Sequence, residues 1–177
     1  MKEMGGLKKL GRVLFFVAIF GLIWWTSSAK QQVNQVKDEI SNQYFFANIL
    51  LRNTVIELLE WNFSQPLTDS PEDKYYLHNL SAEVDYTASL IFSGNVVHHD
   101  WKIRLYDIQN YIQRYILDSS LTEEDAADLH QALRATRFIA TDFIDNANKH
   151  KQYLYDAMHD EKHEMVEQVK SRLDVQY

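Results

Sequence analysis

Residues 13–25 read VLFFVAIFGLIWW, an uncharged and strongly apolar run close to the N-terminus. Leu10 and Gly11 can extend this run, with Arg12 reaching the membrane surface through its aliphatic stem. The resulting stretch of roughly 16 residues would form about 24 Å of α-helix, slightly less than the thickness of a typical hydrocarbon core. We therefore expect residues 10–26 to form a single transmembrane anchor. The side chains expected to contact lipid are Leu10, Val13, Phe15, Phe16, Phe20, Trp24 and Trp25.

Small residues at Ser27 and Ala29 leave a second interpretation open, namely a signal peptide that is cleaved after Ala29. The rings of Trp24 and Trp25 favour a retained anchor, because tryptophan is enriched at membrane interfaces. Under both interpretations the short basic segment 1–9 stays in the cytoplasm and the remainder of the chain is exported. We expect a single-pass protein of a bacterial cell membrane.

The charge of the chain is unevenly distributed. Residues 1–29 carry four basic residues against one acid, a net charge of +3. The formal charge of the whole chain is −7, so about −10 remains for residues 30–177. Phosphate binding needs concentrated Lys and Arg, and an acidic domain of this kind excludes nucleic acid as the expected partner.

The composition predicts long helices and few turns. Only 5 of the 177 residues are Gly and 2 are Pro, whereas an all-β or α/β fold with many connections would use more of both. The chain contains no Cys, so the exported domain has neither disulfides nor thiol chemistry and is held by packing. The length suits one modest domain, residues 27–177, in addition to the anchor.

Apolar residues recur with steps of three and four through this domain, which is the spacing of buried helix faces. Pro66 ends the first such pattern, Pro71 opens the second, Gly94 ends it, and Thr122 is a candidate N-cap for the last. These signals predict helices at about 30–63, 70–93, 97–117 and 122–156, followed by a C-terminal extension, 157–177.

The predicted fold class is all-α: a transmembrane helix followed by an antiparallel four-helix bundle with long first and last helices. This layout is similar to that of the extracytoplasmic domains of bacterial chemoreceptor-type sensors, in which a long first helix leaves the membrane and a long last helix returns. The resemblance concerns the arrangement of the helices. Because the sequence shows no second apolar run, the resemblance does not extend to the signalling activity of that family.

The last helix would match the length of the first by about residue 155, so the C-terminal extension must overhang the bundle, bend away from it or dock on a partner. It is too polar to enter lipid. Its apolar residues form a narrow stripe that is typical of helix-to-helix association, and we expect them to bind a protein partner or a second copy. The residues of this stripe are Met165, Val166, Val169 and Leu173.

The histidines offer the only local pattern that suits a metal. His159 and His163 would lie on one helix face at i and i+4, a spacing that can hold Zn²⁺, Ni²⁺ or Cu²⁺. The pattern is not HExxH, and no third ligand is evident, so a solvated charged face is the preferred interpretation and no metal or cofactor is assigned. We likewise expect the side chains of His98, His99 and Asp100 to form polar surface at the start of a helix.

No nucleophile elbow, phosphate loop or dinucleotide fingerprint occurs, and we do not expect an enzyme. The sequence favours a membrane-anchored helical interaction module, such as an accessory or scaffold subunit of an envelope complex. One alternative is a ligand-sensing bundle that binds a small molecule among the aromatic side chains at its membrane-distal end. These aromatic residues are Trp61, Phe63, Tyr75, Tyr76, Tyr86, Phe92, Trp101, Tyr106, Tyr111 and Tyr115. A second alternative is an envelope protein that binds metal through its histidines.

Overall fold

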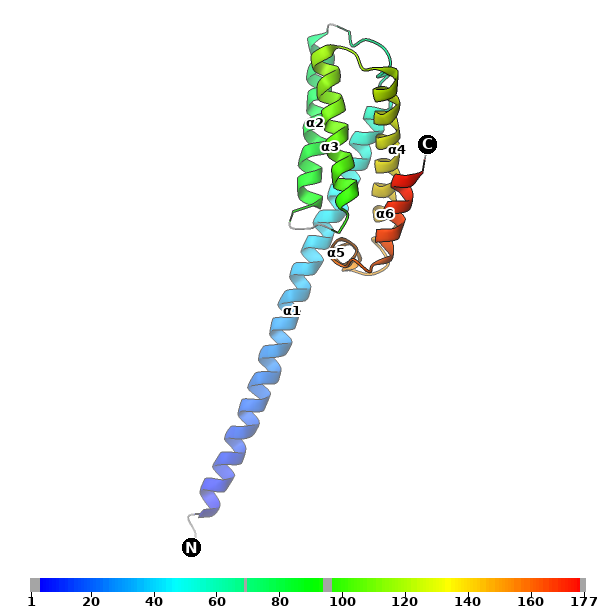
Figure 1. Cartoon of the computed structure of the whole chain (residues 1–177). Helices are drawn as coiled ribbons and strands as arrows, with labels where there is room; N and C mark the ends of the chain where they lie inside the picture. Colours follow the sequence, from blue (N-terminus) through cyan, green and yellow to red (C-terminus); the bar gives the residue numbers. More distant parts are fainter. Residues whose placement is uncertain (1–3, 69, 94–96, 176–177) are drawn as a thin grey trace. The chain divides into compact units, whose positions relative to one another are not determined.

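The computed structural model describes residues 4–68, 70–93 and 97–175, with side chains described from Val17 onward. Within these ranges the chain contains six α-helices and no strand, which confirms the all-helical class and the long first helix (Figure 1). The chain forms two compact units, residues 1–39 and 40–177, and each is described by itself. The helices are α1 (Met4–Leu59), α2 (Pro71–Ile91), α3 (His99–Asp118), α4 (Glu123–Asn146), α5 (Tyr153–His159) and α6 (Glu164–Asp174).

In the first unit, α1 displays its apolar side chains to solvent. Phe20, Trp24 and Trp25 are all exposed, with 74% of the Trp24 surface accessible. The predicted anchor residues Leu10, Val13, Phe15 and Phe16 lie outside the side chains that the structure describes.

Among the residues described, the structure contains no helix that is both long enough and apolar enough to cross a membrane.

The second unit is built around one apolar core to which every helix contributes. From α1 onward the buried positions follow helical spacing, as at Leu51, Val55 and Leu58, because one stripe of each helix faces the others. In Figure 1, α2 lies beside α3 and α3 lies beside α4. The largest fully buried side chains include Trp101, Phe63, Phe143, Leu77, Leu105 and Leu129.

Local capping explains where α2 and α4 begin. The hydroxyl of Ser70 accepts a hydrogen bond from the backbone N–H of Asp73 (3.3 Å), and Pro71 occupies the first turn, where its missing N–H costs nothing. Thr122 caps α4 in the same way through the backbone N–H of Asp125 (3.1 Å). Ser119 ends α3 with a positive φ of 58°.

The C-terminal third differs from the prediction of one last helix with a C-terminal extension. Helix α4 ends at Asn146, a turn follows, and α5 and α6 fold back on the bundle, with α6 packed along α4 and α3 (Figure 1). The physical reason is burial. A straight helix would leave Tyr153, Leu154 and Met158 in water, whereas the turn brings them into the core.

Polar contacts hold the returning segment in place. Arg172 in α6 donates two hydrogen bonds to the Asp142 carboxylate in α4, from Nε (2.8 Å) and from a terminal amine (3.1 Å). The two hydrogen bonds fix the orientation of the guanidinium on the carboxylate and add to the attraction between the opposite charges. Between the turn and α6, the Lys149 ammonium lies 2.6 Å from the carboxylate of Glu164.

Candidate functional site

The predicted partner-binding stripe of the C-terminal extension lies inside the molecule. Met165, Val166 and Val169 are buried, and Leu173 is partly buried against the same core. The expectation that this stripe is free to bind a partner is therefore corrected, because α3 and α4 of the same chain cover it. In this conformation Met165, Val166 and Val169 offer almost no accessible surface to another protein.

His98, at the start of α3, lies at the centre of the contact with the returning segment. Its Nε2 atom lies 2.9 Å from the carbonyl oxygen of Ala157 in α5. Its ring packs edge-on against Phe143 at 5.5 Å between centroids, and Phe143 in turn stacks on Trp101. The expectation that His98 is polar surface is wrong: the side chain is almost fully buried.

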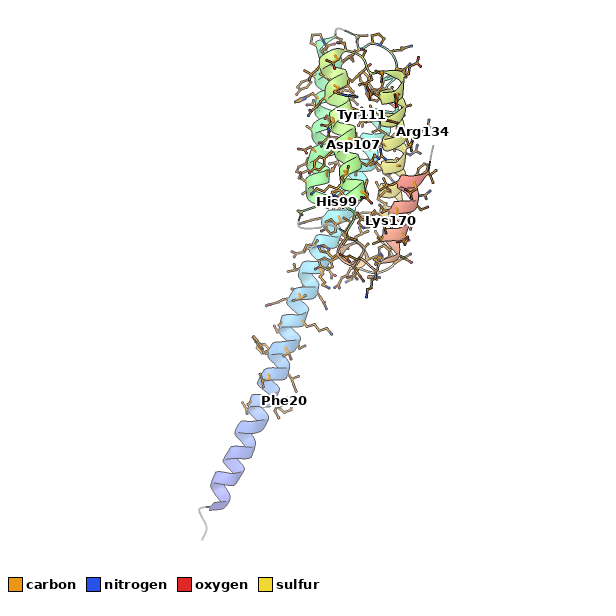
Figure 2. The ribbon with its side chains drawn as sticks, viewed as in Figure 1. Phe20, His99, Asp107, Tyr111, Arg134 and Lys170 are labelled. Carbon is orange, nitrogen blue, oxygen red and sulfur yellow. The ribbon has the colours of Figure 1, made fainter. Side chains whose placement is uncertain are left out.

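Burial lowers the pKa of His98 below its ordinary value, because the apolar rings solvate an imidazolium poorly. The hydrogen bond to Ala157 raises the pKa and so opposes this effect, and the nearby imidazole of His163 lowers the pKa further. A cavity of about 20 Å³, enough for one water molecule, lies beside His98. His99, Asp100 and Lys170 also line this cavity, and Figure 2 labels His99 on α3 and Lys170 on α6.

The two candidate metal ligands do not share a helix face. His159 is the last residue of α5, where Nδ1 bonds the carbonyl oxygen of Tyr155 (2.8 Å) and the ring stacks on Tyr155. His163 is the N-cap of α6, and its Nδ1 accepts a hydrogen bond from the backbone N–H of Met165 (3.2 Å). The chain leaves the helical path between these residues, so their spacing of four residues does not place them on one helix face.

No group of three or more metal-ligating side chains comes together among the described residues.

An open hollow at the α1–α2 connection contains some of the aromatics that suggested a small-ligand pocket. Trp61, Pro66, Asp73 and Tyr115 line it. The Tyr115 hydroxyl donates a hydrogen bond to the carbonyl oxygen of Gln65 (2.8 Å), which also lines the hollow. The hydroxyl of Thr68 is bonded to the Asp73 carboxylate at its edge.

Several exposed apolar side chains lie on α1 in the first unit. Val33 and Val36 are 55% and 54% exposed, and Leu22 and Ile23 are exposed as well. Val33 and Val36 follow the helical spacing of apolar residues in the first helix, but spacing alone does not identify them as a binding surface. Periodicity marks a helix face as apolar and does not reveal whether that face is buried.

No protein-family model, curated protein or solved structure matches this chain.

Proposed function

We propose that this chain is a membrane-anchored interaction module, in which residues 10–26 cross the membrane of a bacterial cell and an antiparallel four-helix bundle lies outside the cytoplasm. The module has no catalytic role of its own. It acts as an accessory or scaffold subunit that joins other proteins of the envelope or copies of itself.

The anchor is supported by the uncharged run at residues 13–25 and by its flanks. Lys8, Lys9 and Arg12 precede the run, and positive charge is retained on the cytoplasmic side of membranes. Trp24 and Trp25 end the run with exposed rings. Exposed rings of this kind gain stability at the lipid headgroups and would promote aggregation in water.

The observation that carries the interaction role is the exposed apolar stripe of α1 beyond these tryptophans. Soluble monomers rarely leave contiguous apolar surface uncovered, and such surface marks contact with protein or lipid. Val33 and Val36 lie 8 and 11 residues after Trp25, about 12 and 17 Å along a helix, beyond the reach of the hydrocarbon core. Protein is therefore the expected partner for this part of the stripe.

Alkaline carbonate extraction of membranes from cells that express the full chain tests the anchor. The protein should remain in the membrane pellet. The variant F20R, which places a charge in the run, should be released in larger part. The matched variant Q35R, outside the run, should stay in the pellet, and complete release of the unmodified chain would contradict the proposal.

The hollow at Trp61, Asp73 and Tyr115 supports a second candidate function, a small-ligand sensor. Its two aromatic side chains and one carboxylate would suit a compact polar molecule. A ligand bound there should raise the melting temperature of the full chain, and the variant W61A should lose that rise. An equal rise in the melting temperature of W61A would show that the ligand binds elsewhere.

A further inference from the structure

The exposed stripe of α1 has the spacing of a coiled-coil seam. Between residues 19 and 36 the steps alternate between three and four, so these positions correspond to a and d of the heptad repeat. The side chains at a are Ile19, Thr26 and Val33, and those at d are Leu22, Ala29 and Val36. Five of the six are exposed, and Ile19 is half-buried.

We propose that the occupant of this stripe is a second copy of the same chain, paired in parallel and in register. The inference rests on the proposed function, because two copies inserted by the same anchor must enter the membrane in the same direction. Their stripes then meet residue for residue at the same depth. Each a or d side chain packs beside its own counterpart, as in a parallel dimeric coiled coil.

The residues that flank the seam favour the parallel pairing over the antiparallel one. Lys30 and Lys37 occupy the two polar e positions. In a parallel pair a residue at g faces the residue at e five positions later on the other copy. Lys30 therefore meets the ring of Trp25, a cation–π contact, and Lys37 meets the amide of Gln32. In an antiparallel pair e faces e, and the two lysines would repel each other.

The expected interface is small. A stripe of 18 residues spans about 27 Å of helix. Two helices paired over this length bury less surface area than stable soluble dimers do. Confinement of both copies in one membrane raises their effective concentration and compensates for the small area. The dimer is therefore expected in the membrane.

The absence of Cys from the chain allows a direct test by single substitution. The variants V33C and V36C place a thiol in the seam, whereas Q31C and Q35C place one on the opposite face of the same helix turns. Each full-length variant is oxidised mildly in native membranes and analysed without reductant. V33C and V36C should give a disulfide-linked homodimer in a yield several times that of Q31C and Q35C.

Co-expression of two differently tagged copies shows whether the disulfide-linked product is a homodimer, since both tags must then occur in the same product. Equal yields at all four positions, no homodimer at Val33 and Val36, or adducts there with a different protein would each overturn the proposal. Carbonate extraction of the same membranes reports separately on the anchor. A chain that stays in the membrane but forms no homodimer at the seam contradicts the dimer and leaves the interaction module standing.

Discussion

His98 Nε2 lies 2.9 Å from the carbonyl oxygen of Ala157, 59 residues later in the chain, and this contact joins the start of α3 to α5. A neutral imidazole with its hydrogen on Nε2 donates this bond while the ring faces Phe143. Burial of the ring lowers the pKa of His98, so protonation of His98 costs free energy in the folded state. Acid is therefore expected to weaken the packing of the C-terminal segment on α3.

The first prediction is that acid destabilises the fold through His98. Burial lowers its folded pKa below the ordinary value of 6.5, so the unfolded chain binds the proton more tightly. Stability is full above pH 6.5 and is lost as the pH falls from there toward the folded pKa. Urea unfolding of the full chain in detergent at about pH 7.5 and about pH 5.5 should reveal this loss.

The control for the first prediction is the neighbouring histidine. The exposed variant H99Q should keep the pH dependence of the unmodified chain. H98Q should be less stable at neutral pH and should show a weaker dependence. A residual slope is expected in H98Q, because burial also lowers the pKa of His130. The role of His98 would be rejected by equal slopes in H98Q and H99Q.

The second prediction concerns the docking of α6. Met165 is fully buried between α6 and the rest of the core, so M165A should lower the free energy of unfolding by about 2–4 kcal/mol. Leu117 is 81% exposed, and L117A should change the free energy of unfolding by less than about 0.5 kcal/mol. Urea unfolding measures both. Similar small effects at the two positions would show that α6 is not packed on the bundle.

The starts of α2 and α4 were readable from the sequence because local capping chemistry determines them. Ser70 and Pro71 are a cap and a first-turn proline, and α2 begins at Pro71. Thr122 is likewise the cap of α4. The long first helix and the all-helical class follow from periodicity in the same way.

The end of α4 was not readable, because tertiary burial determines it. Neither Gly nor Pro lies near Asn146, yet the chain turns there so that Tyr153 and Met158 reach the core. The available signal is the polar run 145–152, DNANKHKQ, which has a single apolar residue. Such a run permits a solvated turn as readily as a solvated helix face.

The candidate sites were harder to predict than the fold. The sequence identified the α6 stripe as apolar, but only the structure shows that this chain covers it. The stripe at Val33 and Val36 has the same periodicity and the opposite outcome, since it is exposed. Periodicity identifies an apolar helix face and does not show whether the same chain, another protein or lipid covers that face.

The third prediction concerns a buried hydroxyl. Thr136 is fully buried in α4, and its hydroxyl has no hydrogen-bond partner among the described residues. Replacement by the similarly shaped valine removes an unsatisfied group, so T136V should raise the free energy of unfolding by about 1 kcal/mol. Calorimetry or urea unfolding measures the change.

Thr87 is the matched control for the third prediction. It is equally buried, but its hydroxyl donates to the carbonyl oxygens of Glu83 (2.8 Å) and Val84 (3.0 Å). T87V should therefore leave stability unchanged or lower it. A loss of stability in T136V comparable to that in T87V would mean that the Thr136 hydroxyl is satisfied.

Labelling of a single cysteine in intact cells tests most directly the central claim that the helical domain lies outside the cytoplasm. The variant L117C places a thiol at an exposed position of α3, and L7C places one before the apolar run. A maleimide that cannot cross the inner membrane should label L117C in intact cells and L7C only after lysis. Labelling of L117C only after lysis would contradict the export of the domain and, with it, the proposed function.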